Sequence, residues 1–280
     1  MSNAVTGAST KPTTRLSLNQ KTVNSLGVVE AVELCQRHDI ASIGLWREPV
    51  ADHGLDATVE LIKESGLRVS SLCRGGWFTA TGQAFEDAIE ANRRAIEEAQ
   101  ALEAACLCLV VGGLPDGSKD LGAARDQVRR ALELLVPYAV DRGVTLALEP
   151  MNPIYAADRG VLSTLGQALD LCEPYGPEVG VMVDSFHVWW DPQLQDQLQR
   201  AGSRIVSYQI CDWITPLPAD TLLARGMMGD GHIDFAALGQ LVAEAGYTGD
   251  IEVEIFNADI WAADPNQVVS TMIDRYAALC

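Results

Sequence analysis

Four oxygen-bearing side chains stand at or next to the ends of four apolar runs in the second half of the chain. The runs are VTLALE, VGVMVD, RIVSYQ and DIEVEI, and the side chains are Glu149, Asp184, Gln209 and Glu254. Carboxylate and amide oxygens suit hard divalent cations such as Mg²⁺ and Mn²⁺. Three carboxylates brought together without a cation would raise one another's pKa. The pattern predicts a divalent-metal site, provided that the four runs end at one place.

The elements that would position these side chains repeat along the whole chain. From Leu16 onward, short β-type runs alternate with longer segments of helical apolar spacing. Several runs are almost continuously apolar, which is typical of parallel strands covered by helices. The runs predict eight strands, at 16–20, 40–46, 67–73, 105–111, 144–149, 179–184, 204–210 and 250–256. The intervening segments predict helices at about 28–38, 55–65, 84–104, 120–142, 163–173, 192–201, 235–245 and 265–278.

The residues between these elements fit the same interpretation. Gly66, Gly143 and Gly246 each follow a predicted helix, where a left-handed residue is favoured. Ser163 and Asp234 stand where a helix N-cap is expected.

Eight such units without a linker rich in Pro, Gly and Ser predict a single-domain α/β fold, the (β/α)₈ TIM barrel, over residues 15–280. Residues 1–14 are predicted to form a flexible N-terminal tail. An open doubly wound sheet is the alternative, but its phosphate-binding glycine motifs are missing. In a TIM barrel the carboxyl ends of the strands meet at one mouth, so the four side chains would converge there.

Composition limits the classes of partner. With 48% hydrophobic and 21% charged residues, the chain has the composition of a soluble globular protein. A formal net charge of −18 disfavours nucleic acid, whose phosphates need basic contacts. No apolar run approaches the roughly 20 residues of a membrane span, and the polar N-terminus lacks a signal sequence. Seven cysteines without paired spacing favour a reducing compartment. We therefore expect a cytoplasmic protein without nucleic-acid or membrane partners.

Five segments together resemble one known superfamily. They are LALEP (146–150), MVDSFH (182–187), SYQICDW (207–213), RGMMGDGHID (225–234) and IEVEIF (251–256). This set resembles the sugar-phosphate isomerase/epimerase superfamily of xylose-isomerase-like TIM barrels, which share the endonuclease IV-type fold. The match covers the second half of the chain, while the first half contributes mainly the strand–helix rhythm.

The resemblance implies a role for individual residues. Glu149 and Glu254 resemble paired glutamates that bind the metal and exchange protons with the substrate. Asp184 resembles a further metal ligand, while His187 and Arg225 resemble residues that bind the substrate.

Gln209 departs from the common pattern, because most relatives have His at this ligand position. An amide oxygen can still coordinate a metal, as Gln does in the related hydroxypyruvate isomerases, so Gln209 is predicted as the fourth ligand.

The ligand set implies a reaction. One divalent metal ion, Mn²⁺ or Mg²⁺, would polarise a carbonyl and a neighbouring hydroxyl, and a carboxylate would remove the proton between them to give a metal-bound enediolate. Returning the proton gives an isomerase or epimerase of a small sugar, keto-sugar or cyclitol. A homo-oligomer is compatible with the resemblance.

Several alternatives stay open. A lyase acting on a 3-keto glycoside, of the C-glycoside deglycosidase type with a small partner subunit, would use the same chemistry, as would an inosose dehydratase-like enzyme. A non-catalytic sugar-binding protein is compatible with Gln209. A DNA-repair endonuclease is disfavoured, since the histidines expected after strands three and four are absent.

Aromatic and charged residues at other strand ends complete the candidates. Trp46 and Trp77 could form an aromatic wall against a sugar ring or could belong to the core. Arg74 and Asp212 could be partners in structural ion pairs, and Asp212 is also a candidate substrate contact.

Overall fold

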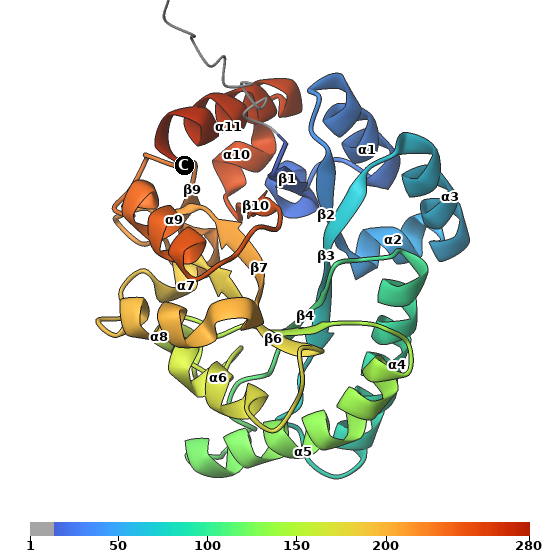
Figure 1. Cartoon of the computed structure of the whole chain (residues 1–280), viewed down its shortest axis with the longest axis vertical. Coiled ribbons are helices and arrows are strands. Elements are labelled where there is room, and N and C mark those ends of the chain that lie inside the picture. Colours follow the sequence, from blue (N-terminus) through green and yellow to red (C-terminus); the bar gives the residue numbers. More distant parts are fainter. Residues whose placement is uncertain (1–13) are drawn as a thin grey trace, which may run out of the picture.

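The eight apolar runs form eight parallel strands that close into a barrel, and the long helices lie outside it (Figure 1). This computed structural model describes residues 14–280, so the predicted tail lies outside the described residues except for Thr14. The order around the barrel is β1-β10-β7-β6-β5-β4-β3-β2. The strands are β1 Leu16–Asn19, β2 Ser42–Trp46, β3 Arg68–Gly76, β4 Leu107–Val110, β5 Leu146–Leu148, β6 Val179–Asp184, β7 Ile205–Ile210 and β10 Ile251–Val253. The predicted TIM barrel is confirmed.

The predicted helices are also present, within two or three residues at most ends. They are α1 Val28–Arg37, α3 Leu55–Ser65, α4 Gln83–Ala101, α5 Leu121–Val140, α6 Leu165–Cys172, α8 Leu194–Ala201, α9 Phe235–Glu244 and α11 Pro265–Leu279. Shorter segments were not predicted: α2 Arg47–His53, α7 Ser185–Val188, α10 Ala258–Ala262, the 3₁₀ turns η1 Gln20–Val23, η2 Pro153–Tyr155, η3 Gly202–Arg204 and η4 Thr221–Ala224, and the antiparallel pair β8 Asp212–Trp213 and β9 Arg225–Gly226.

Local sequence explains where helices begin and end. Gly66 ends α3 in the left-handed conformation, with φ 71°, that favours glycine. The Asp234 carboxylate accepts a hydrogen bond from the Ala237 N–H and caps α9 as predicted. At α6 the prediction was wrong by one residue. Thr164, not Ser163, is the N-cap, because its hydroxyl accepts the Gln167 N–H.

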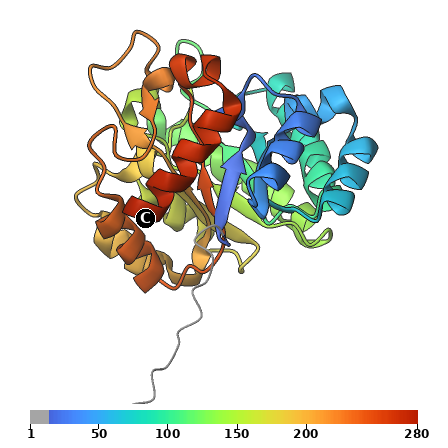
Figure 2. The ribbon, with the colours of Figure 1, turned by 90° about the horizontal axis from the view of Figure 1, so that it is seen from above.

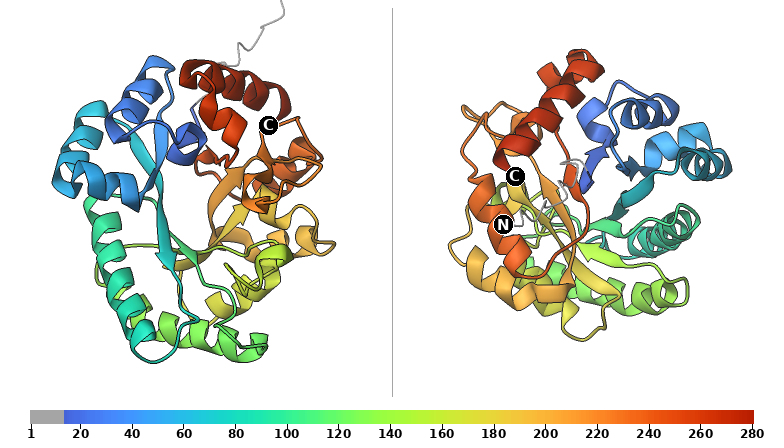
Figure 3. Two further views of the ribbon diagram at one scale, coloured as in Figure 1. Left: turned by 180° about the vertical axis from the view of Figure 1, so that it is seen from behind. Right: turned by 45° about the horizontal axis from the view of Figure 1, so that its top comes forward.

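The barrel closes where the first and last strands meet. β1 pairs with β10 through Leu16 and Ile251, and α11 lies beside this seam in two views (Figures 2 and 3). Helix α4 shows why the outer layer is stable, since Phe85, Ile89 and Ile96 follow helical spacing and are buried against the strands. Each such side chain contributes about 1.5–3 kcal/mol by leaving water.

A polar layer lies inside the barrel, where aliphatic side chains are usual. The buried Glu252 carboxylate accepts hydrogen bonds from Asn19 (2.6 Å), Ser70 (2.5 Å), Ser71 (2.9 and 3.1 Å) and Gln209 (2.7 Å). Gly44 of β2 makes room for it, because a Cβ there would lie 2.5 Å from this carboxylate. The layer forms the floor beneath the mouth.

No helix within residues 14–280 combines the length and the apolar character needed to cross a membrane.

Candidate active site

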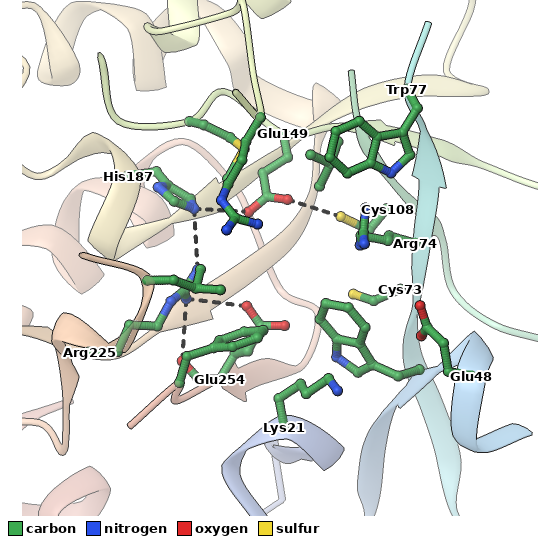
Figure 4. A pocket seen from close by; sticks show the side chains of 16 residues that line it. Lys21, Glu48, Cys73, Arg74, Trp77, Cys108, Glu149, His187, Arg225 and Glu254 are labelled. Atoms are coloured by element: carbon green, nitrogen blue, oxygen red, sulfur yellow. Dashed lines mark hydrogen bonds and ion pairs between the residues drawn. The ribbon is translucent and has the colours of Figure 1, made fainter. Parts of the chain in front are cut away.

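A cavity of about 240 Å³ opens at the carboxyl ends of the barrel strands (Figure 4). This volume is below the range typical of drug-sized ligands, so the cavity suits a small molecule. Six of the predicted site residues line it: Trp46, Trp77, Glu149, His187, Arg225 and Glu254. The other lining residues are Lys21, Glu48, Cys73, Arg74, Cys108, Val110, Met151, Arg159, Leu222 and Phe256.

Arg225 lies at the centre of the acidic residues. Its guanidinium is 2.8 Å from Asp184 Oδ2, 3.2 Å from Glu254 Oε2 and 3.2 Å from His187 Nε2. The β8–β9 pair holds its backbone, since Trp213 pairs with Arg225, and the Asn257 amide donates to the Arg225 carbonyl. Arg225 is 2% exposed, and its Nε is buried without a hydrogen-bond partner. A cation thus already occupies the point at which the carboxylates converge.

Glu149 directly follows β5 and contacts two neighbours. The Cys108 thiol of β4 donates to Glu149 Oε2 at 3.2 Å, and His187 Nε2 lies 3.4 Å from Glu149 Oε1. Burial, together with the nearby Asp184 charge, raises the pKa of Glu149 to about 7, although the Arg225 charge opposes this rise. A carboxyl with this pKa can give or take a proton near neutral pH.

Glu254 follows β10 and reaches the same cavity from another side of the barrel. Burial also raises its pKa well above the ordinary value, although the Arg225 charge opposes this. Because β6 and β7 separate β5 from β10, Glu149 and Glu254 approach the cavity from different directions. A substrate carbon between them could be reached on two faces.

His187 lies on α7, the single turn that Asp184 caps through the Phe186 N–H. The Asn152 backbone N–H donates to His187 Nδ1 at 3.2 Å, so the ring proton of the neutral form belongs on Nε2. Burial lowers the pKa of His187 to about 3, so the ring stays neutral at physiological pH. Nε2 faces Glu149 Oε1, which can accept its proton at 3.4 Å, and Arg225 Nη2, which can only donate, at 3.2 Å. The donor role of Nε2 therefore depends on the position of Arg225.

The donor set fits a divalent cation. Among residues 14–280, Glu149, Asp184 and His187 are a group whose ligand atoms all lie within 4.8 Å of one another. Both ring nitrogens of His187 already have a neighbour, Asn152 N–H at Nδ1 and Arg225 at Nε2, whereas Glu149, Asp184 and Glu254 offer carboxylate oxygens. The Arg225 guanidinium among them already compensates their charge as a bound cation would. An all-oxygen set suits a hard ion.

Gln209 lies beneath this set and does not line the cavity. It is opposite Glu252 in the strand register, and its Nε2 donates to Glu252 Oε1 at 2.7 Å. Only the amide nitrogen can donate to a carboxylate, so this contact orients the side chain and leaves Oε1 as the atom that could coordinate. The predicted ligand role of Gln209 depends on that oxygen.

Asp212 has a structural position. Its carboxylate accepts hydrogen bonds from the backbone N–H groups of Trp213, Gly229, Gly231 and Ile233 at 2.8–3.0 Å. It holds the loop after β9 and does not line the cavity. It is not placed for the predicted substrate contact.

The residues of the mouth form two walls. We call Glu149, Asp184, His187, Arg225 and Glu254 the paired wall, because each has a polar atom within 3.4 Å of another member. Asp184 belongs to it through Arg225 and does not itself line the cavity. We call Lys21, Trp46, Glu48, Arg74 and Trp77 the unpaired wall, because none of its three charged side chains forms an ion pair with a residue of the described chain.

Sequence reasoning did not single out several lining residues. Lys21, Glu48 and Arg159 had no motif to mark them, whereas Cys108 could have been found from its inward position on β4, beside the Glu149 strand. Arg74, considered a structural ion-pair partner, has no carboxylate partner among residues 14–280 and lines the cavity.

The barrel and its site define a class of protein, the TIM-barrel proteins with a carboxylate cluster at the mouth. A family model, the xylose isomerase-like TIM barrel, matches residues 21–278. The chain belongs to this family.

Two characterised relatives are an isomerase and an epimerase. An inosose isomerase from Halalkalibacterium halodurans is 22% identical over 93% of this chain and 94% of its own length. An L-ribulose 3-epimerase from Mesorhizobium japonicum is 30% identical over 54% of this chain and 48% of its own length. Both of these relatives are thus named as enzymes that isomerise or epimerise a small sugar or cyclitol.

Solved structures agree on the fold. Protein SMc04130 from Sinorhizobium meliloti 1021 is 46% identical, with a TM-score of 0.93, over 95% of this chain and 98% of that one. The IolI protein, solved with a bound zinc atom, is 21% identical with a TM-score of 0.80 over 95% of this chain and 99% of that one.

Proposed function

We propose that this chain is a divalent-metal-dependent isomerase or epimerase of a small sugar, keto-sugar or cyclitol. The observation that carries the proposal is the pair of buried carboxyls, Glu149 and Glu254, whose pKa values are raised and which face one small cavity. The isomerase and epimerase relatives support the reaction class, and the zinc-bound IolI structure supports a metal.

Glu149, Asp184 and Glu254 would hold the metal, with Gln209 Oε1 as a further ligand. A bound divalent cation would polarise the substrate carbonyl and acidify the neighbouring C–H. One of the two glutamates removes that proton, and the electrons move into the enediolate of the substrate. Return of a proton by the other glutamate, on the opposite face, gives the epimer. Return to the neighbouring carbon gives the aldose–ketose isomer.

The other residues of the paired wall prepare the substrate. His187 Nε2–H would donate to a substrate oxygen once Arg225 has turned away from it, while the Asn152 N–H keeps the ring in place through Nδ1. Arg225, which contacts Asp184 and Glu254 here, would be free to donate to a substrate oxygen if a bound cation balanced those carboxylates. Trp46 and Phe256 pack edge to face, with ring centroids 5.6 Å apart, and keep water away from one side of the cavity.

Exchange of substrate hydrogen with solvent tests the proposal. The chain is incubated in D₂O with ketohexoses, inososes, hydroxypyruvate and 3-keto glycosides, with Mn²⁺ or with EDTA. We expect deuterium at the carbon next to the carbonyl of at least one compound, with Mn²⁺ only. Equal exchange in EDTA would contradict the metal, and no exchange would contradict the reaction. Net elimination would instead assign the lyase.

A further inference from the structure

Basic side chains are concentrated in the pocket of an otherwise acidic chain. Four of its 16 lining residues are Lys or Arg, namely Lys21, Arg74, Arg159 and Arg225. The whole chain has 20 Lys and Arg against 38 Asp and Glu. Arg225 is neutralised by Asp184 and Glu254, so it does not explain the excess. The remaining cations must be balanced by water, by counterions or by a ligand.

Among these cations, Arg74 is the one that most clearly lacks a partner for its charge. Its guanidinium centre lies 4.9 Å from the centroid of the Trp77 ring and 5.9 Å from that of Trp46, and it makes no hydrogen bond or ion pair with a side chain of residues 14–280. It lines the same cavity as Glu149 and Glu254, so its charge faces the reaction site. Contacts with the ring faces leave the N–H groups at the guanidinium edge free.

The neighbouring charges do not satisfy Arg74. Glu48 is exposed and forms no ion pair with Arg74 or Lys21. Lys21 Nζ contacts the Asn24 amide at 3.1 Å and lies over Trp46 at 4.8 Å. Arg159 lies 3.5 Å from Asp158 and 5.9 Å from the centroid of the Tyr155 ring. The cavity lining thus holds four basic and three acidic side chains, and Arg74 has no ion pair among residues 14–280.

The segment that bears Arg74 is held firmly. Just after Arg74, Gly76 donates its N–H to the Asn92 side chain of α4 at 2.7 Å, and its carbonyl accepts from the same amide at 2.8 Å. Both groups are buried. β3 lies across the eight-stranded barrel from β7, so Arg74 faces the paired wall from the far side of the mouth. A ligand between the walls would meet the glutamates at one end and Arg74 at the other.

We propose that the substrate of this pocket is a sugar acid, whose carboxylate is bound by the free edge of the Arg74 guanidinium with Lys21 and Arg159 nearby. A planar carboxylate matches the in-plane pair of guanidinium N–H groups. The inference rests on the proposed function for the position of the reacting carbon. It adds an anionic group at the opposite end of the substrate and identifies Arg74 as the residue that selects it.

Matched ligands and variants test this inference. Dissociation constants are measured by calorimetry on Mn²⁺-loaded protein for D-fructose, D-fructuronate and D-fructose 6-phosphate, which differ at one end of the molecule. We expect fructuronate to bind at least about tenfold more tightly than fructose, as for a hydrogen-bonded charged pair. Arg74→Met should remove this preference, so that fructuronate and fructose bind with similar dissociation constants. Arg129→Met, which removes the same charge from the exposed outer helix α5, should retain it.

Four results would overturn the inference. They are equal binding of fructose and fructuronate, undetectable binding of fructuronate, a preference for fructuronate that survives Arg74→Met, and tighter binding of fructose 6-phosphate than of fructuronate. The deuterium assay separates the two proposals. Arg74-dependent uronate binding without exchange would contradict the proposed function alone. Exchange on neutral sugars without a carboxylate preference would contradict this inference alone.

Discussion

The paired wall and the unpaired wall hold their charges in opposite ways. On the paired wall, Arg225 contacts Asp184 and Glu254 within 3.2 Å, and all of these side chains are buried. On the unpaired wall, Arg74 and Lys21 lie against tryptophan rings without a carboxylate partner. Buried and mutually compensated charges favour proton transfer, whereas free charges at the mouth favour recognition. This difference is the basis of our proposal that the paired wall carries out the chemistry and the unpaired wall selects the ligand.

The largest expected effect comes from removing the carboxylates of the paired wall. Glu149→Gln or Glu254→Gln should lower kcat by about 10²–10⁴-fold, because each removes a group that transfers a proton. Steady-state rates at saturating Mn²⁺ measure this, with thermal unfolding as a check on the fold. Glu48→Gln removes a carboxylate from the unpaired wall of the same cavity and should change kcat by less than about tenfold. An equally large loss of kcat in Glu48→Gln would contradict a special role of the paired wall in proton transfer.

Arg225→Met should destabilise the metal-free chain by about 3–5 kcal/mol, because it leaves buried carboxylates without their cation. Mn²⁺ should then raise the free energy of unfolding more in this variant than in the wild type, since it need not displace the guanidinium. Chemical denaturation with EDTA and with Mn²⁺ measures both effects, and Arg159→Met is the control from the same cavity. Equal stabilisation of variant and wild type by Mn²⁺ would contradict competition between Arg225 and the metal.

Glu252→Gln tests the buried polar layer that lies beneath the paired wall. The new amide nitrogen would face groups that donate to the carboxylate, so the free energy of unfolding should fall by about 1–3 kcal/mol. Urea denaturation measures the loss. Glu244→Gln on the exposed face of α9 makes the same chemical change and should cost little. A Glu252→Gln protein as stable as the wild type would mean that the polar layer is not needed.

The buried His187 ring makes the free energy of unfolding depend on pH. Its pKa is lowered to about 3, so below about pH 6.5 the unfolded chain binds a proton that the folded chain does not. This contribution to stability is therefore present at neutral pH and is lost as pH falls from about 6.5 toward 3. In EDTA-treated protein, His187→Gln should flatten the pH dependence of unfolding by up to about 1.4 kcal/mol per pH unit. Parallel curves for the two proteins would argue against a buried neutral ring.

The smallest effect is expected at the outer edge of the unpaired wall. Trp77 is 42% exposed, so Trp77→Ala should lower the free energy of unfolding by about 1 kcal/mol or less. Its loss should weaken uronate binding by a few fold, because Arg74 loses one of its two aromatic neighbours. Leu134→Ala, at 41% exposure on α5, is a control for stability. Unchanged uronate binding in Trp77→Ala would show that the ring does not hold Arg74 in place.

The strands and long helices of the barrel could largely be predicted from the sequence, because they depend on patterns that act over a few residues. Apolar runs and helical spacing identified the eight strands and the eight long helices, and strand order then placed Glu149 and Glu254 at one mouth. The turns α2 and α7 were missed because helices of seven and four residues show no periodicity. The β8–β9 pair was missed because two residues per strand give no alternation.

The contacts within the site depend on more distant parts of the chain. Arg225 reaches Asp184 from 41 residues away, and no local rule orients its side chain. The residue types near Gln209 suggested a ligand, but its amide is oriented by Glu252, its neighbour in the register between β7 and β10. Glu252 lies two positions before Glu254 in the predicted strand 250–256, so its inward direction could have been predicted.

The division of roles between the walls is tested most directly by the rate of solvent-deuterium exchange at saturating substrate, compared between Glu254→Gln and Arg74→Met with Mn²⁺ present. The substrate is the compound that the wild type exchanges fastest. We predict that Glu254→Gln loses exchange at every substrate concentration, whereas Arg74→Met needs more substrate but reaches a rate close to that of the wild type. A saturating rate for Arg74→Met as low as that of Glu254→Gln, or full exchange by Glu254→Gln, would contradict the account.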